Sequence, residues 1–314
     1  MKAARKWQRG VALILVLWVS ILLTVIAASF AFATRTDMQV LQNSVSTARA
    51  EAAANAGIYR ILYDLYKPSN NEERWQADGQ THDMTFGGVK LVVSALDESG
   101  KIDINAAASE LLKGLFVSAG VTEEDALALV DAVQDWRDND NLRRLNGAEE
   151  AEYRAAGLKY KPANVPFQTI EELQLVLGMK PEIYRRIADI ITVYSRQPGL
   201  NVSIASRAAL LAIPGASAEQ VDGYIAQREA ARAAKQPLPP FAPGARYVGL
   251  AYNFAFSLRA AARLDDGTVF VREAVAQVLP DPKRPYTFLS WKEATPVSSE
   301  PLNETSTAQN VQPK

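Results

Sequence analysis

The feature that most constrains this chain is an uncharged apolar run near its start, residues 11–33. Within these 23 residues only Ser20, Thr24 and Ser29 are polar. As a helix, at about 1.5 Å per residue, the run spans roughly 34 Å, which is enough to cross a hydrocarbon core of about 30 Å. The sequence therefore predicts a single transmembrane helix over residues 11–33.

The charges before this run predict its orientation. Lys2, Arg5, Lys6 and Arg9 all precede the apolar residues. By the positive-inside rule such a basic flank stays in the cytoplasm. We therefore expect a single-pass inner-membrane protein, with the N-terminus cytoplasmic and the chain from about residue 35 onward in the periplasm.

An ordinary secretory signal peptide is the alternative for this segment. Ala31-Phe32-Ala33 has the small-x-small form of a leader peptidase site, and cleavage after Ala33 would release a Sec-processed soluble periplasmic protein. Two features oppose this interpretation. The run exceeds the 7 to 15 residues of a signal core, and helical spacing of apolar residues continues from Arg35 to Leu65. One long helix over 11–66 fits better.

Strand patterns occur on both sides of a long helical region. A hairpin is predicted around Gly87-Gly88, with strands over 84–86 and 89–96, and strand patterns return at 253–264, 268–279 and 286–291. The pattern from Asn105 to about Ala234 is helical. These patterns predict an α+β fold in which an α-domain is inserted between strands of one antiparallel sheet. The expected boundaries are 67–102 for the first part of the sheet, 103–250 for the α-domain, 251–293 for the second part and 294–314 for a disordered tail.

The predicted α-domain contains an approximate repeat of helix, Gly-centred turn and helix. The turns lie at Gly120 and Gly215, with a weaker copy at Gly178. This helix-hairpin-helix form often binds DNA, so a membrane-anchored DNA receptor is a candidate from another functional class. Residues 101–230, however, hold 14 Lys and Arg against 19 Asp and Glu. Because DNA binding needs cations to face phosphates, we expect no nucleic-acid partner.

A dense acidic segment lies between the first two hairpins. Six carboxylates occur between Asp135 and Glu152. Asp side chains at i, i+3 and i+5, closed by a returning Glu, supply the hard oxygen ligands that suit Ca²⁺, although no EF-hand pattern is present. We expect a calcium site formed by Asp135, Asp138, Asp140 and Glu149. The alternative is a solvated loop whose acids pair with arginines, namely Arg137, Arg143, Arg144 and Arg154.

Composition argues against several other chemistries. The chain has no Cys and a single His, His82. Metal sites built from His and Cys, and Ser-His or Cys-His catalysis, are therefore not expected. Removing the first ten residues, which hold four positive charges, takes the formal net charge from −1 to −5. We expect a non-enzyme with a mildly acidic exterior.

The start of the chain resembles the prepilin signal of type IV pilins and pseudopilins: a short basic leader ending in Arg9-Gly10, then a long apolar helix. The resemblance implies that a prepilin peptidase removes residues 1–10 by cutting between Gly10 and Val11, and that Val11 becomes N-methylated. Most members of that family carry Glu at mature position five, where this chain has Leu15. That Glu can pair with the N-terminal ammonium of a neighbouring subunit in an apolar filament core, and Leu15 cannot.

The chain resembles the K-type minor pseudopilins of type II secretion in three features. It lacks that Glu, and it carries Asp-Trp-Arg-Asp-x-Asp at 135–140 and Gly-Ala-Glu at 147–149. The resemblance implies a pilin-like helix on a small antiparallel sheet, a large inserted all-α domain of helix-hairpin-helix or SAM-like type, and bound calcium. It also implies a single copy at the pseudopilus tip that initiates assembly for export of folded proteins across the outer membrane. The implied partners are the I-type, J-type and possibly H-type pseudopilins, the prepilin peptidase and the inner-membrane assembly platform.

Overall fold

The computed structural model describes residues 11–68, 71, 73–249, 255–279, 281 and 283–295. The predicted leader, with Gly10, lies outside the described residues, as do residues 253–254 of a predicted strand and residues 296–314 of the predicted tail. Ala294, which the sequence analysis assigned to the tail, instead ends the last strand.

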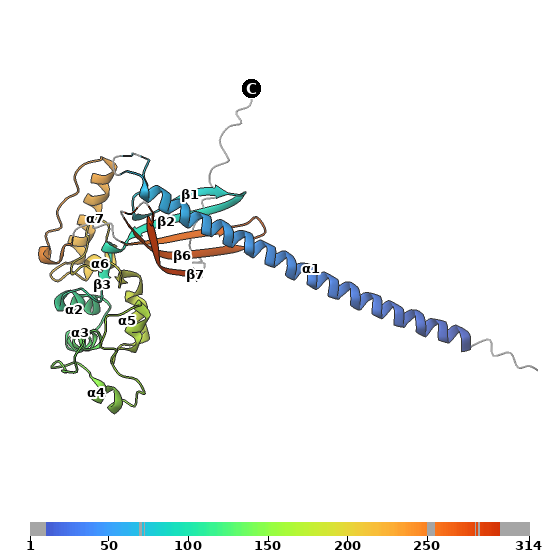
Figure 1. Ribbon diagram of the computed structural model, residues 1–314, viewed down its shortest axis with the longest axis horizontal. Helices are drawn as coiled ribbons and strands as arrows, with labels where there is room; N and C mark the ends of the chain where they lie inside the picture. The colour runs from blue at the N-terminus through green and yellow to red at the C-terminus, as the bar shows by residue number, and fades with distance from the viewer. Residues whose placement is uncertain are drawn as a thin grey trace, which may run out of the picture.

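The N-terminal segment forms one continuous helix, α1 (Val11–Tyr66), which extends far beyond the rest of the molecule (Figure 1). Residues 12–45 are exposed along its whole circumference. Within the described residues, α1 is the one helix long and apolar enough to cross a membrane, and the rest of the chain buries none of its most apolar window. The last turns differ, because Ala50, Ala54, Ile58 and Ile61 are fully buried.

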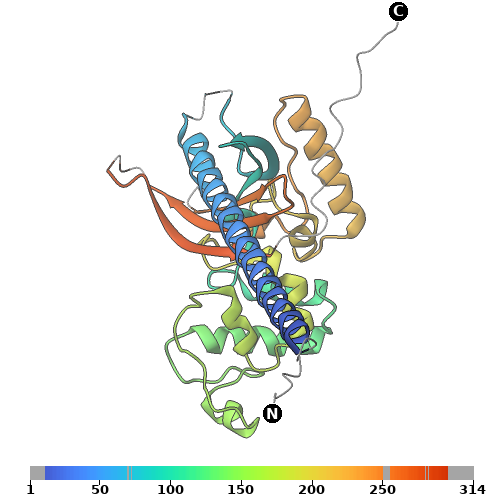
Figure 2. The same cartoon turned by 90° about the vertical axis from the view of Figure 1, so that its right-hand side faces the viewer.

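These last turns pack across a five-stranded antiparallel sheet (Figure 2). The strands are β1 (Asp78–Phe86), β2 (Val89–Asp97), β5 (Ala255–Arg263), β6 (Val269–Val278) and β7 (Tyr286–Ala294), in the order β1-β2-β5-β6-β7. The predicted hairpin around Gly87-Gly88 is present, the predicted strand patterns around 253–264 and 268–279 pair as a second hairpin, and the α+β fold is confirmed. Strand β2 alternates buried and partly exposed side chains, so its inward residues form one core with α1.

A single glycine sets the distance between α1 and the sheet. A Cβ on Gly57 would lie 2.9 Å from the Cβ of Ala260 and 3.1 Å from Cγ1 of Val93. Neither neighbour is the end of a flexible side chain. Only glycine at position 57 therefore permits the helix backbone to approach the sheet so closely.

The α-domain lies between β2 and β5 in the chain and has its own core. Its helices are α2 (Ser109–Ser118), α3 (Glu123–Arg137), α4 (Glu150–Ala155), α5 (Pro181–Ile187), α6 (Arg207–Leu211) and α7 (Ala218–Ala233). Its 3-10 turns are η1 (Glu98–Gly100), η2 (Ile170–Leu175), η3 (Ala188–Ile190) and η4 (Ala245–Tyr247). Two short parallel strands, β3 (Ile102–Asp103) and β4 (Ile191–Thr192), complete it.

The structure corrects the expectation of helix from residue 105 to residue 234. Residues 138–149 and 156–169 contain neither helix nor strand. Pro162 and Pro166 interrupt the second stretch, and Gly157 at its start has a left-handed backbone (φ 76°). Ile102, which was expected in the first part of the sheet, belongs to the core of the α-domain through β3.

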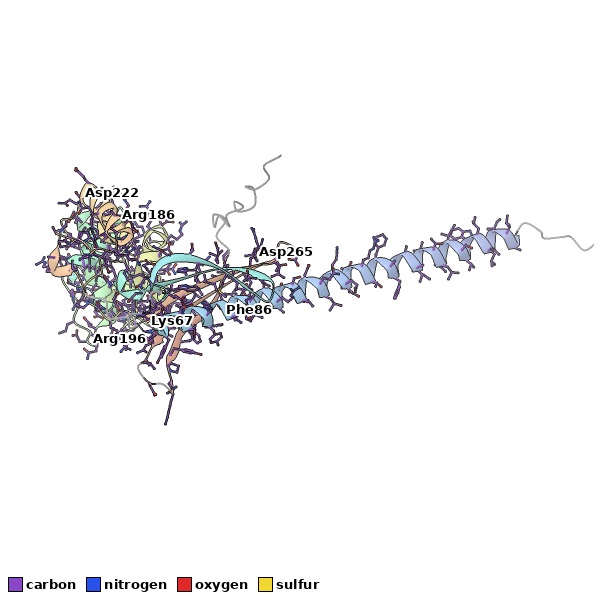
Figure 3. The ribbon with its side chains drawn as sticks, turned by 90° about the horizontal axis from the view of Figure 1, so that it is seen from above. Lys67, Phe86, Arg186, Arg196, Asp222 and Asp265 are labelled. Atoms are coloured by element: carbon purple, nitrogen blue, oxygen red, sulfur yellow. The ribbon has the colours of Figure 1, made fainter. Side chains whose placement is uncertain are left out.

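The two halves of the molecule lie at opposite ends of the sheet. Phe86 and Asp265, at the turns of the two hairpins, face the free half of α1, whereas the α-domain covers the far end (Figure 3). The β5–β6 turn also holds α1, because Ser46 Oγ donates to Asp266 Oδ2 at 2.5 Å. The α-domain therefore forms the end of the molecule that lies farthest from the apolar segment.

Replacing Gly57 by Ala is expected to destabilise the protein, although Gly to Ala inside a helix ordinarily stabilises. Overpacking against Ala260 and Val93 should cost about 1 to 3 kcal/mol. The control is Gly223→Ala in α7, where an added Cβ meets nothing within 4 Å; it should stabilise by about 0.5 to 1 kcal/mol. Urea unfolding of the detergent-solubilised chain measures both. If both substitutions changed the free energy of unfolding by the same amount in the same direction, the close contact between α1 and the sheet would be contradicted.

Candidate functional site

The acidic segment is a loop that connects α3 to α4. Helix α3 begins after Thr122, whose side chain caps it, and Asp135 lies in its last turn. The loop rests on an aromatic cluster, since Trp136 is 3% exposed and its ring centroid lies 6.1 Å from that of Phe167 and 6.0 Å from that of Tyr153. This cluster fixes the end of α3, and with it the position of Asp135.

The four predicted calcium ligands lie on this loop and at its two ends. Asp135 is fully buried and Glu149 is 7% exposed, whereas Asp138 is half-buried and Asp140 is exposed. Asp138 Oδ1 and Glu149 Oε1 are both buried and have no hydrogen-bond partner. Asp140 Oδ1 accepts from the backbone N–H of Leu142 at 2.7 Å. The cluster thus combines buried negative charge with unused acceptor atoms, an arrangement that favours a bound cation.

The pKa of Glu149 shows that these acids act on one another. Burial raises the pKa of its carboxyl, and the negative charges of Asp135, Asp138, Asp140 and Glu152 raise it further. Such coupling requires the charges to lie close together. The four predicted residues therefore interact electrostatically, and together they form an acidic cluster.

Backbone packing holds the loop against Asp135. A Cβ on Gly147 would lie 2.0 Å from Asp135 Oδ2, so only glycine permits this approach. The backbone N–H of Arg144 also donates to Asp135 Oδ2, at 3.2 Å. Both contacts draw the returning chain over the buried carboxylate and bring Glu149 near to it.

Arginine pairing, the alternative for these acids, is present in part. Arg144 Nη1 lies 2.7 Å from Asp135 Oδ1 and also contacts Asp138 Oδ2. Arg143 pairs with Glu152 at 3.1 Å, and Arg154 pairs with Glu150. Arg137 does not take part as expected, because its guanidinium donates to the carbonyl oxygens of Ile104 and Ala107. Within the described part of the chain, no three His, Asp or Glu side chains are arranged to hold a metal ion as they stand.

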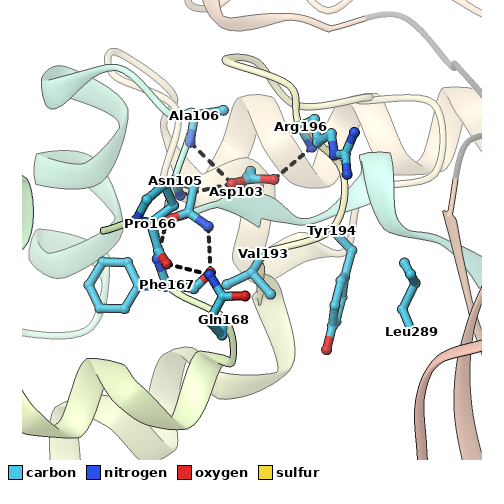
Figure 4. A pocket seen from close by; sticks show the side chains of 10 residues that line it. All are labelled: Asp103, Asn105, Ala106, Pro166, Phe167, Gln168, Val193, Tyr194, Arg196 and Leu289. Carbon is cyan, nitrogen blue, oxygen red and sulfur yellow. Dashed lines mark hydrogen bonds between the residues drawn. The ribbon is translucent and has the colours of Figure 1, made fainter. Parts of the chain in front are cut away.

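A second polar centre lies where the α-domain meets β7 (Figure 4). Asp103 is 1% exposed and accepts from the backbone N–H groups of Asn105 (2.8 Å), Ala106 (3.1 Å) and Arg196 (2.7 Å), and from Ser195 Oγ. Burial raises the pKa of its carboxyl, against the effect of these hydrogen bonds. Asp103 thus stabilises the turn at residues 103–106 through its hydrogen bonds, and it links residues 195–196 to β3.

Glu98, which no sequence pattern singles out, lies at the junction of the sheet and the α-domain. Its carboxylate is 2% exposed and accepts from Lys101 Nζ at 2.8 Å, from Thr192 Oγ1 and from Ser257 Oγ. Glu98 therefore binds β4 of the α-domain and β5 of the sheet together, and no local pattern could have indicated partners so distant in sequence.

The three predicted hairpins share one backbone geometry. Gly120, Gly178 and Gly215 all have left-handed backbones, with φ of 89°, 86° and 84°. In each case the next helix begins after a cap two residues beyond the glycine. The first turns of these helices carry carboxylates: Glu123, Glu124 and Asp125 in α3, Glu182 in α5 and Glu219 in α7. These acids occupy the helix ends that would otherwise attract DNA phosphates.

Comparisons with known proteins agree with one another. The family model described as "Type II secretion system (T2SS), protein K" matches residues 90–196. Type II secretion system protein K of Klebsiella pneumoniae is 28% identical over 227 residues, which cover 65% of this chain and 69% of that protein. The protein of the same name from Pseudomonas aeruginosa is 28% identical over 247 residues, which cover 69% and 73%.

A solved structure has the same fold. The crystal structure of the GspK-GspI-GspJ complex from enterotoxigenic Escherichia coli contains a chain that superposes with a TM-score of 0.57 at 16% sequence identity. The superposition covers 84% of this chain and 99% of that one. At this identity the likeness establishes the shared architecture of helix, sheet and inserted α-domain.

Proposed function

We propose that this chain is a K-type minor pseudopilin of a type II secretion system, and that it caps the distal tip of the pseudopilus and initiates its assembly. The observation that carries this proposal is the place of the α-domain. It covers the end of the sheet farthest from the apolar half of α1 (Figure 1). A subunit whose distal end is covered in this way leaves room for neighbours only on its membrane side.

The features of α1 also favour a position at the tip of the filament. In pilin-like assemblies the long helices of neighbouring subunits pack side by side, and the exposed residues 12–45 of α1 offer such a surface. Leu15 cannot compensate the N-terminal ammonium of another subunit as a buried Glu does. A chain without that carboxylate suits a position that is used once.

The proposed partners are the I-type and J-type minor pseudopilins, with the H type as a further neighbour. The solved complex that shares this fold holds a K-type chain together with I-type and J-type chains. Contact through α1 and through the globular domain would form the corresponding complex here. The prepilin peptidase and the inner-membrane assembly platform are the proposed partners during maturation and assembly.

The proposed topology is a single span over residues 11–33 with the globular part in the periplasm. Helix α1 continues without a break through Ala33 and into the turns that pack on the sheet. Cleavage after Ala33 would cut this helix in its middle, which favours removal of residues 1–10 alone. The relatives are subunits of a secretion machine, and the proposal assigns this chain no catalytic role. The acids on the hairpin helices weigh against the alternative of a DNA receptor.

We also propose that the acidic loop binds Ca²⁺ through Asp135, Asp138, Asp140 and Glu149. The donor atoms fit the ion chemically, since two carboxylate oxygens of the cluster are buried without a hydrogen-bond partner, and binding would draw the carboxylates closer together. All four ligands are carboxylates, the hard donors that Ca²⁺ prefers. When bound, the ion would supply positive charge that joins the end of α3 to the start of α4, and so would stabilise a loop that lacks helix and strand.

Stoichiometry tests the capping role. The mature periplasmic part from residue 35, mixed with those of the I-type and J-type proteins, should form a one-to-one-to-one complex by light scattering that does not grow. The control replaces the α-domain by a two-residue turn, which can join β2 to β5 because Asp97 lies opposite Phe256. This variant should permit larger assemblies. Growth of the unmodified complex, or several copies of this chain in it, would defeat the proposal.

Processing is tested by the intact mass of the mature protein. We expect an N-methylated N-terminus at Val11. Gly10→Val should leave the precursor uncleaved, and Ala33→Val, at the alternative site, should have no effect. A mature N-terminus at Thr34 would rule out the pseudopilin pathway.

Calcium binding is tested by thermal unfolding of wild type and Glu149→Gln. Because the pKa of Glu149 is raised on folding, its ionisation lowers stability at neutral pH, and this loss is relieved as pH falls towards the folded pKa. In EGTA at pH 7, Glu149→Gln should therefore melt roughly 2 to 4 °C higher than wild type and depend less on pH. Millimolar calcium should raise the Tm of wild type and have less effect on the variant.

The matched control is Glu150→Gln, since Glu150 is the next residue but is half exposed and pairs with Arg154. It should behave as wild type does in both EGTA and calcium. If wild type melts at one temperature in both conditions, calcium binding is excluded.

A further inference from the structure

The acidic loop contains its own cation, the guanidinium of Arg144. Its Nη1 lies 2.7 Å from Asp135 Oδ1 and also contacts Asp138 Oδ2, so one nitrogen bridges two of the four proposed ligands. The carboxylate of Asp135 is fully buried, whereas the side chain of Arg144 is 38% exposed. The guanidinium therefore reaches the cluster from the solvent side.

Arg144 compensates this cluster only in part. Glu149 is 7% exposed, and its Oε1 has no hydrogen-bond partner; the same is true of Asp138 Oδ1. The other basic side chains near the loop are engaged elsewhere. Arg143 pairs with Glu152, Arg154 and Lys161 pair with Glu150, and Arg137 donates to backbone carbonyls. The guanidinium of Arg144 thus contacts two of the four carboxylates, and buried acceptors remain for a second or a larger positive charge.

The main chain of Arg144 is held independently of its side chain. Its backbone N–H donates to Asp135 Oδ2 at 3.2 Å, and Gly147 packs directly on the same carboxylate. If the guanidinium leaves, these two contacts keep the loop in place. The side chain can then extend into solvent, where a guanidinium is stable, without unfolding of residues 138–149.

We propose that Arg144 is an internal competitor for calcium, so that the guanidinium and Ca²⁺ occupy Asp135 and Asp138 in turn. This inference rests on the proposed calcium site. Without the ion, Arg144 neutralises the buried Asp135 and keeps the loop folded. When calcium binds, it displaces the guanidinium outward and also engages Glu149, which Arg144 leaves unpaired. Arg144 therefore lowers the affinity of the site for calcium, and binding also moves the carboxylates closer together, since no three described acids are arranged to hold an ion as they stand.

Calcium titration of the full mature chain in detergent tests this exchange. Calorimetry should give Arg144→Gln an affinity at least about tenfold higher than wild type, because no charge-assisted bond must be broken on binding. In EGTA the same variant should melt at a lower temperature, since Asp135 loses its counter-ion. Arg144→Lys keeps the charge but lacks the planar guanidinium, so its calcium affinity should lie between those of wild type and Arg144→Gln. It also replaces Arg144→Gln as the test variant if that variant does not fold.

Arg143→Gln is the matched control, because it removes the same charge from the neighbouring position, where the guanidinium pairs with Glu152. Its affinity should stay within about twofold of wild type. If Arg144→Gln and Arg143→Gln bind calcium equally, the competition is refuted while the calcium site stands. If wild type binds no calcium and Arg144→Gln does, Arg144 is confirmed as the occupant and calcium binding by wild type is refuted. If neither binds, both proposals fail.

Discussion

The pairing of β2 with β5 is the constraint on which the rest of this structure depends. Asp97, the last residue of β2, lies opposite Phe256 near the start of β5, so the whole α-domain leaves and re-enters the sheet at neighbouring points. The next residue, Glu98, is buried and accepts hydrogen bonds from both sides of the junction. Two hydrophobic cores can therefore lie end to end without sharing residues. Helix α1 and the sheet keep their own packing, while the α-domain extends the molecule at one end of the sheet (Figure 3).

Much of the fold could be predicted because its signals are local. Alternating side chains and the turns at Gly87-Gly88 and Asp266-Gly267 define two hairpins within a few residues each. The three helix-hairpin-helix units were recognisable for the same reason, since Gly120, Gly178 and Gly215 each occupy a backbone conformation that few other residues adopt. The uninterrupted helix α1 follows from composition alone. In each case the residue that determines the structure lies next to the structure it determines.

Contacts between residues that lie far apart in the chain could not be predicted from the sequence. Strands β3 and β4 have two residues each, too few for any periodicity, and pair across most of the α-domain. Clustering of Asp135, Asp138, Asp140 and Glu149 was predictable from their spacing along one loop. The cation that contacts them could not be predicted, because four arginines lie close to them in sequence. Of these four, Arg144 is the one whose guanidinium contacts Asp135 and Asp138. Arg137, the arginine within the motif itself, donates instead to the backbone carbonyls of Ile104 and Ala107.

The insertion at Asp97 also sets the order in which the chain can fold. Strand β2 cannot pair with β5 until both ends of residues 98–254 have come together, and for an unfolded segment that closure costs chain entropy, about 0.6 kcal/mol for each doubling of length. A folded α-domain holds its two ends close, which reduces the closure to that of a short turn. The α-domain core is built from contacts within the segment itself, so it can form first. Closure of the sheet under α1 is then the late step, and until it occurs the apolar faces of α1 and β2 remain open to other chains.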